Sequence, residues 1–99
     1  MKLMTKQLEK RFATIGDQSE VDDPIVIAKF FNPSGSGTWY ATKYNPESSI
    51  FYGYVTGLQF DEWGCFSLIE LKAVTCPPFG LGIERDRWFE ETRFSKLGL

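Results

Sequence analysis

The sequence predicts a single α+β domain spanning residues 1–99, with an antiparallel sheet of four or five strands, a short N-terminal helix and a short helix near residues 68–74. Three observations support this fold class. The chain has 99 residues, a length typical of one domain. Nine of its 16 aromatic residues lie within residues 38–67, mixed with β-branched residues as in strands. Segments rich in Pro, Gly, Asn and Ser separate these stretches and predict turns.

Residues 6–15 predict the N-terminal helix. Thr5 is a suitable N-cap, and Gly16 is a suitable end. Apolar residues recur at the spacing of one helical face: Leu8, Phe12 and Ile15. A helix this short is not stable alone in water, so we expect its apolar stripe to pack on the sheet.

Two segments of different character follow the helix. Residues 17–23 are polar and acidic and predict a mobile loop, and their spacing matches no calcium-binding pattern. Residues 25–31 predict one strand with apolar residues on both faces, so we expect it to be central or covered on both sides. Residues 32–37 form a small-residue turn without the Gly-Lys-Ser/Thr ending of a phosphate loop.

A hairpin of two aromatic strands, residues 39–44 and 50–59, is the centre of the predicted sheet. Strict alternation would place Gly53 and Gly57 on one face of the second strand, with Tyr52 and Tyr54 on the other. Glycine in a strand often marks close approach by other atoms. We therefore expect a bulky element, such as the N-terminal helix, over the two glycines.

The C-terminal third is less regular. Residues 61–64 predict a turn, and residues 65–66 a short strand in which Cys65 is buried. Ser67 and Glu70 fit a capping box for a helix over residues 68–74. Residues 77–82 predict a loop. Residues 83–94 predict a last strand, with a helical turn at 84–87 as the alternative, and the final residues are expected to fray.

Composition narrows the function classes. The net charge of −2 argues against a general duplex-DNA binder, which needs clustered Lys and Arg. No apolar run is long enough to span a bilayer, and residues 1–6 lack the apolar core of a signal peptide. We therefore expect a cytoplasmic protein with no membrane partner, whose two cysteines, Cys65 and Cys76, are free thiols.

The chain contains no histidine. This removes the Ser-His and Cys-His nucleophile pairs, the commonest general base and the commonest metal ligand. An enzyme is therefore less favoured than a binding protein, and we expect no catalytic residue, metal or cofactor.

The first candidate binding site is an aromatic platform made by Trp39, Tyr52 and Tyr54 on adjacent strands. Such a platform suits a protein hot spot, which favours Trp, Tyr and Arg, or the stacked bases of single-stranded nucleic acid. The alternative is that these rings pack the core.

The second candidate site is formed by Arg85, Arg87 and Trp88. In an extended segment the two arginines share a face and could hold a phosphate or a carboxylate. The alternative is that the neighbouring Glu84 and Asp86 pair with basic residues or fasten the loop. A set of carboxylates could also serve a metal-dependent nuclease: Asp61, Glu62, Glu70, Glu84 and Asp86.

Several short segments, in this order, resemble the bacterial family DUF2958: residues 4–8, 23–26, 29–33, 38–42, 51–55, 57–58, 66–71 and 81–86. Cys65 stands where the resemblance leads us to expect an aromatic residue, and Gly82 where we expect proline. The resemblance implies a small bacterial protein carried by plasmids or other mobile genetic elements, and it implies no catalytic residues.

These observations lead to three functional hypotheses. The leading one is a non-enzymatic module that binds a protein partner. The second is a single-stranded nucleic-acid-binding module that uses the aromatic sheet face. The third is a carboxylate-dependent enzyme such as a metal-dependent nuclease.

Overall fold

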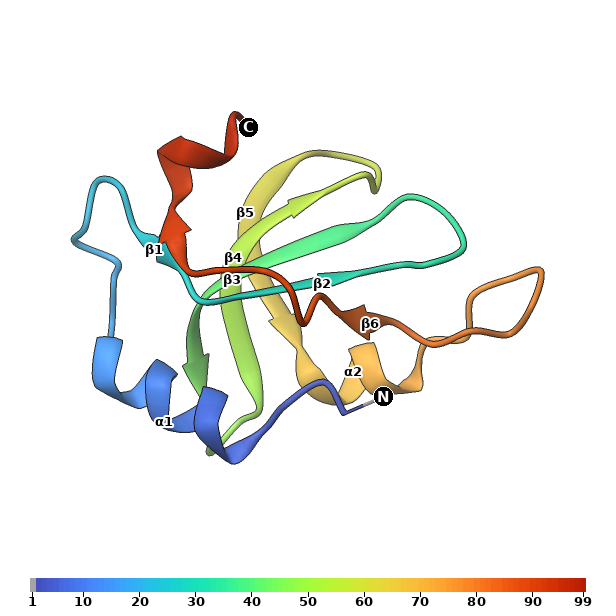
Figure 1. Cartoon of the computed structure of the whole chain (residues 1–99), viewed down its shortest axis with the longest axis horizontal. Coiled ribbons are helices and arrows are strands. Elements are labelled where there is room, and N and C mark those ends of the chain that lie inside the picture. The colour runs from blue at the N-terminus through green and yellow to red at the C-terminus, as the bar shows by residue number, and fades with distance from the viewer. Residues whose placement is uncertain (1) are drawn as a thin grey trace.

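The computed structural model describes residues 2–99 and confirms the α+β class (Figure 1). Five antiparallel strands form the main sheet in the order β5-β4-β3-β2-β6. Their bounds are β2 Ala28–Phe31, β3 Thr38–Asn45, β4 Ile50–Thr56, β5 Glu62–Ser67 and β6 Glu84–Arg85. A second sheet pairs β1 with β7: Ile25–Val26 and Thr92–Arg93. The helices are α1 (Lys6–Ile15), α2 (Leu68–Ala73) and the 3₁₀ helix η1 (Phe94–Leu97).

Helix α1 has the predicted bounds, because its ends are set by local capping. The Thr5 Oγ1 atom accepts a hydrogen bond from the Leu8 amide at 3.1 Å, and Gly16 ends the helix with a φ of 69°. Buried Phe12 packs on the sheet, with its ring centroid 5.8 Å from that of Phe51. No helix within residues 2–99 is long and apolar enough to cross a bilayer.

Helix α2 is confirmed and ends one residue earlier than predicted, at Ala73. Ser67 caps it by accepting a hydrogen bond from the Glu70 amide at 3.2 Å. Leu68 and Leu71 are buried against the same core as α1. That core lies on one face of the main sheet and includes Phe30, Ala41 and Phe51.

The predicted single strand at residues 25–31 is two strands in two sheets. β2 pairs with β3 and β6 in the main sheet, whereas β1 pairs with β7 near the C-terminus. Ile27, at the break, donates its amide to the Ala41 carbonyl at 2.9 Å. The apolar residues on both faces of this segment therefore serve two sheets.

The β3–β4 hairpin contains a β-bulge that the alternation of residues does not reveal. The register shifts between Ala41 and Lys43, so Thr42 is the extra residue. As a result Trp39 and Ala41 before the bulge, and Tyr44 after it, all pack with the core. Strict alternation along residues 39–44 would instead predict Tyr44 on the face opposite to Trp39, and the bulge makes that prediction wrong.

Gly53 is required by the neighbouring strand and not by a helix. A Cβ atom at this position would overlap the carbonyl oxygen of Tyr40 and lie 3.0 Å from the Cα atom of Ala41. Gly57 lies beyond the end of β4, in the following turn, with a φ of 78°. A Cβ atom there would lie 2.6 Å from the Gly37 amide nitrogen, so this glycine too is approached by a backbone. The expected helix over both glycines is thus corrected to a close approach of neighbouring backbone, from β3 at Gly53 and from the 32–37 turn at Gly57.

Residues 62–64, predicted as part of a turn, begin strand β5, which pairs with β4 from Ile50↔Ser67 to Val55↔Glu62. Phe66 stacks on Phe51 in the core at 5.1 Å. Alternation therefore turns Cys65 outward, and the expectation of a buried Cys65 is wrong. Cys76 is the buried cysteine, and both thiols are free.

The predicted last strand over residues 83–94 is reduced to β6 and β7, with a turn at residues 87–88. The chain end is anchored rather than frayed. The Phe94 amide donates to the Pro24 carbonyl at 2.8 Å. The Asp23 carboxylate accepts from the Ser95 amide at 2.9 Å and from its hydroxyl at 2.6 Å.

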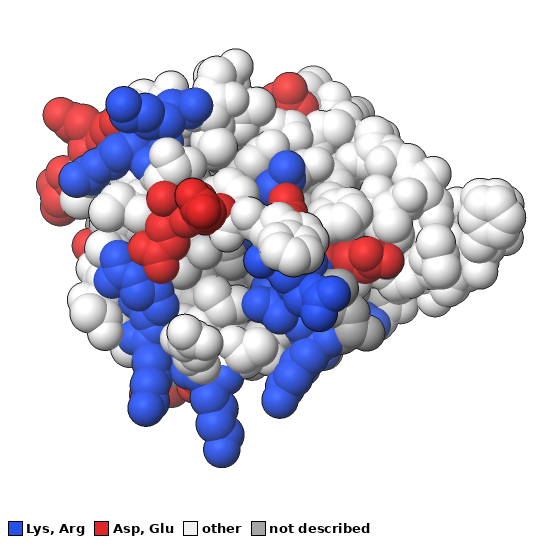
Figure 2. Space-filling view, viewed as in Figure 1, with Lys and Arg blue, Asp and Glu red and all other residues white. Residues whose placement is uncertain are grey.

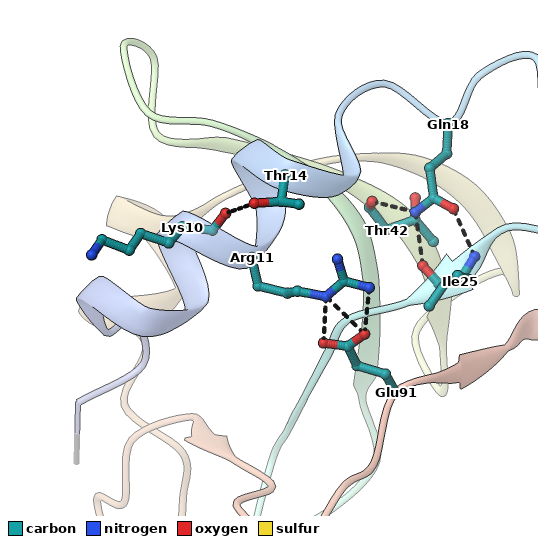
Figure 3. A network of polar contacts seen from close by, with 7 residues as sticks. All are labelled: Lys10, Arg11, Thr14, Gln18, Ile25, Thr42 and Glu91. Carbon is teal, nitrogen blue, oxygen red and sulfur yellow. Dashed lines mark hydrogen bonds and ion pairs between the residues drawn. The ribbon is translucent and has the colours of Figure 1, made fainter.

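The acidic segment 17–23 is fastened to the sheet by Gln18, which is only 8% exposed. Its Nε2 atom donates to the carbonyls of Ile25 and Thr42, both at 2.8 Å (Figure 3). Its Oε1 atom accepts from the Ile25 amide at 2.7 Å. The side chain thus satisfies the backbone of the bulge and of β1, and the segment has a fixed anchor that its polar sequence does not predict.

A second contact in the same view joins α1 to the C-terminal segment. The Arg11 guanidinium lies 2.9 Å from the Glu91 carboxylate (Figure 3). Both side chains are about one-third exposed. An exposed pair of this kind contributes little to stability.

We predict that Gly53→Ala destabilises the protein by about 3 kcal/mol, because the new methyl group forces β3 and β4 apart. Urea denaturation monitored by circular dichroism measures the change. Gly64→Ala is the matched control, since Gly64 of β5 pairs with Gly53 of β4 and nothing lies within 4 Å of a Cβ built at Gly64. Equal losses in the two variants would contradict the role given to the Tyr40 carbonyl.

We also predict that Gln18→Ala costs about 3 kcal/mol of stability, because it leaves buried backbone groups of Ile25 and Thr42 without partners. The control is Gln7→Ala, the same change at an exposed position of α1, which should be nearly neutral. Chemical denaturation of both variants tests this, and a Gln18→Ala loss no greater than the control's would refute the anchor.

The Asp23 contact predicts a pH dependence. Hydrogen bonds from the Ser95 hydroxyl and amide lower the pKa of Asp23 below its ordinary value. The carboxylate therefore adds stability above the unfolded pKa of about 3.9, and this share is lost as the pH falls through the lowered folded pKa. The melting-temperature gap between wild type and Asp23→Asn should shrink on acidification below pH about 4. The gap for Glu20→Gln, on the same exposed segment, is the control, and a constant Asp23→Asn gap would oppose the assignment.

Candidate functional site

The main sheet face opposite the core carries four aromatic side chains in mutual contact. We call this set the aromatic face: Tyr52, Tyr54, Trp63 and Phe94. β4 alternates buried Phe51 and Gly53 with Tyr52 and Tyr54, so these tyrosines point away from the core. β5 adds Trp63, which lies across from Tyr54 in the register.

The rings of the aromatic face are arranged around Trp63. Tyr52 stacks on Trp63 with ring centroids 6.0 Å apart and planes inclined by 15°. Tyr54 meets Trp63 edge-on at 5.3 Å. Phe94, held by the anchored C-terminal segment, lies 4.7 Å from Trp63 and 5.0 Å from Tyr54. The four rings therefore form one preorganised surface on the sheet.

Two of these rings remain open to solvent. Tyr52 is 39% exposed and Trp63 is 37% exposed, whereas Tyr54 and Phe94 are half-buried. The stacked pair therefore offers accessible ring surface that the packing of the domain does not use.

A pocket of about 550 Å³ adjoins the stacked pair. The sheet contributes Tyr52, Trp63 and the exposed Cys65, and the acidic segment contributes Asp17 and Asp22. We call it the acidic pocket. Its shape depends on Gln18, because that side chain ties the acidic segment to β1 and β3.

The electrostatics of the acidic pocket are negative. The Asp17 carboxylate accepts a hydrogen bond from the Ser19 amide at 2.9 Å, which is the main cause of its lowered pKa. Asp17 therefore stays ionised at neutral pH. It lies 3.6 Å from the Lys43 ammonium, the one cation in the lining. Two carboxylates, those of Asp17 and Asp22, face one lysine, so the pocket has an excess of negative charge.

Of the three residues predicted to form an aromatic platform, Trp39, Tyr52 and Tyr54, one does not lie on the outer face. Tyr52 and Tyr54 lie on the outer face, but Trp39 is 9% exposed and belongs to the core, opposite Val55 in the register. Trp63 takes its place. Its position went unrecognised because the acidic residues and glycine around it suggest a turn, and nothing local to Phe94 indicates its long-range contact.

The second predicted site lies away from the aromatic face and consists of Arg85, Arg87 and Trp88. They line a second pocket, of about 520 Å³, together with Lys29. We call it the basic pocket. β6 ends at Arg85 and Arg87 lies in the next turn, so the two arginines line one pocket without lying on one extended strand.

Asp86 makes the structural contacts that the alternative interpretation of this segment predicts. Its Oδ1 atom accepts a hydrogen bond from the Trp88 amide at 3.0 Å, and its Oδ2 atom lies 3.8 Å from the Lys29 ammonium.

The carboxylates predicted as a possible metal site do not converge. Within residues 2–99 no group of three or more acidic or cysteine side chains could hold a metal ion.

The surface in Figure 2 divides into charged and uncharged regions. Lys and Arg side chains gather along the lower edge, over α1, and again near the centre. The loop between α2 and β6 projects to the right and carries no charge over residues 74–83. Its Phe79 is 78% exposed, so apolar surface is also present away from the aromatic face.

Comparison with known proteins gives a family and no function. Searches of curated proteins and of solved structures found no match. The family model described as "Protein of unknown function (DUF2958)" matches residues 3–96, nearly the whole chain. The chain therefore belongs to the DUF2958 family.

Proposed function

We propose that this chain is a non-enzymatic protein-binding module that docks its partner on the aromatic face and the acidic pocket. The observation that supports this function is the stacked, half-open pair of Tyr52 and Trp63 at the mouth of the pocket. It combines an exposed ring surface with an adjacent cavity, which is the arrangement of an interface anchor.

The energetics favour a protein partner. Trp and Tyr dominate interface hot spots because they bury a large area and lose little conformational freedom. Here the loss is smaller still, since Phe94 and Tyr54 already contact the Trp63 ring. The rings are therefore preorganised for contact, and binding does not have to order them.

The charge of the acidic pocket defines the partner further. The excess carboxylate favours a segment that places a Lys or Arg beside an apolar side chain, because the cation can meet the carboxylates and the ring faces together. We propose that this partner is encoded by a mobile element or its bacterial host, as the family resemblance implies, and that the two proteins meet in the cytoplasm.

Single-stranded nucleic acid is the second candidate for this face. The ring planes of Tyr52 and Trp63 are nearly parallel, and such rings can stack bases. The charge opposes it, since Lys43 is the one cation in the lining and is already beside Asp17. Salt-dependent oligonucleotide binding that is lost in Tyr52→Ala or Tyr54→Ala, without unfolding, would favour this candidate instead.

We predict that Trp63→Ala weakens partner capture by at least about tenfold, because truncating a central interface Trp costs about 2 kcal/mol or more. Tagged full-length protein is incubated with bacterial lysate, and retained proteins are quantified by mass spectrometry. Tyr52→Ala should lose the same protein. Phe79→Ala, an exposed aromatic on the projecting loop, is the matched control and should retain it.

Melting curves accompany each variant, so that a loss of capture is interpreted only for folded protein. A partner retained equally by wild type, Trp63→Ala and Tyr52→Ala would place the interface elsewhere. No protein retained above background by the wild type would count against the proposed function itself.

A further inference from the structure

The basic pocket lies at the other end of the main sheet order from the aromatic face. β6 is the edge strand beside β2, whereas β5 is the opposite edge. The pocket is bounded by β2, β6, the connection of residues 32–37, the first residue of β3 and the turn after β6. It is therefore a separate feature, and neither the core nor the proposed protein interface uses it.

Asp86 shapes the rim of this pocket. Its amide donates to the Lys29 carbonyl at 2.9 Å, which continues the pairing of β6 with β2 by one residue. Its carboxylate then accepts the Trp88 amide and approaches the Lys29 ammonium. These contacts fix the turn that carries Arg87 and Trp88, so the backbone from which both side chains project is held in place.

Two groups at the rim have binding capacity left over. Arg87 is exposed and forms no ion pair within residues 2–99. Trp88 is 89% exposed, the highest value among the large apolar side chains. A guanidinium and an indole on consecutive residues of a fixed turn offer a phosphate-binding group next to a stacking surface.

The rest of the lining suits the same kind of ligand. Three cations, Lys29, Arg85 and Arg87, face two carboxylates, Glu84 and Asp86, which leaves one net positive charge. The acidic pocket has the opposite balance, with two carboxylates and one cation. The whole chain has a net charge of −2. The basic pocket, unlike the acidic pocket, nevertheless has a local excess of positive charge and therefore favours an anion.

Polar groups add hydrogen-bonding capacity beside the charges. The Asn32 side-chain carbonyl accepts the Ser34 amide at 2.8 Å, which leaves its NH₂ group as a donor. Glu84 supplies acceptors for hydroxyl groups. The pocket thus combines a stacking ring, cations for a phosphate, and a donor and an acceptor for a sugar or a base edge.

We propose that the basic pocket binds a nucleotide, with the base on Trp88 and the phosphate on Arg87 and Lys29. The shared chemistry is a base next to a phosphate, which either a free mononucleotide or the phosphorylated end of a nucleic-acid single strand would present. This assignment is independent of the aromatic face, so either proposal can fail while the other stands.

The test is a titration of the full-length, ¹⁵N-labelled protein with AMP, followed by NMR. The indole N–H signal of Trp88 should shift with a Kd of about 1 mM, as expected for an open pocket with few contacts. The signals of Trp39 and Trp63 should not move, since these residues lie in the core and on the aromatic face. Trp88→Phe assigns the signal and should keep most of the affinity, because Phe also stacks.

The variants separate the two halves of the ligand. Arg87→Gln should weaken AMP binding about tenfold through loss of a charge-assisted contact. Trp88→Ala should weaken it about tenfold through loss of stacking. Lys96→Gln, at an exposed position outside the pocket lining, should leave affinity unchanged. Both pocket positions are exposed, so these variants are expected to fold, and thermal melts check this.

Three further ligands show which parts of the nucleotide are needed and whether the ligand is a free nucleotide or the end of a strand. Adenosine and inorganic phosphate should each bind at least about tenfold more weakly than AMP, since each lacks one half of the ligand. A short 5′-phosphorylated oligodeoxyadenylate that binds more tightly than AMP would identify a strand end, and equal affinity would identify a free nucleotide. An unmoved Trp88 signal, equal affinity for adenosine and AMP, or AMP affinity unchanged in both Arg87→Gln and Trp88→Ala would overturn the proposal.

Discussion

The β-bulge at Thr42 is the constraint on which the rest of the structure depends. Without the extra residue, strict alternation would turn Tyr44 away from the side that Trp39 and Ala41 occupy, and the core would lose a ring. The bulge also takes the Thr42 carbonyl out of the β-ladder, and a buried carbonyl without a partner is costly. The Gln18 side chain donates a hydrogen bond to this carbonyl and removes that cost. The bulge in β3 therefore supplies the contact that fixes the acidic segment in place.

The same register decides what the outer surface offers. β4 has no extra residue in its pairing with β5, and Gly53 lets its backbone approach the Tyr40 carbonyl. Tyr52 and Tyr54 therefore stay on the outer side along the whole strand, where Trp63 can lie against both. Core packing and the aromatic face are thus two results of one strand pairing. A change that relaxed the pairing would disturb both.

The sequence predicted those features whose causes are local. Both helices follow from capping residues, Thr5 and Ser67, that act within one turn, and the outward direction of Tyr52 and Tyr54 follows from alternation over a few residues. Features that depend on distant backbone were missed: the bulge, the division of residues 25–31 between two sheets, and the arrival of Phe94 on the sheet. Of the exposed aromatic pair, Tyr52 was predicted and Trp63 was not. Trp63 belongs to a strand only through its pairing with β4, which is a long-range contact.

The two pockets also show why whole-chain charge is a poor guide to the partners of this protein. A net charge of −2 argues against a phosphate ligand only if the charge is spread evenly, and it is not. The acidic pocket has more carboxylates than cations and the basic pocket has fewer, and they lie toward opposite edges of one sheet. Charged groups act strongly over about one Debye length, roughly 8 Å at physiological ionic strength. A ligand in either pocket therefore responds to the local lining, and a small acidic domain can favour a cationic partner on one side and an anionic one on the other.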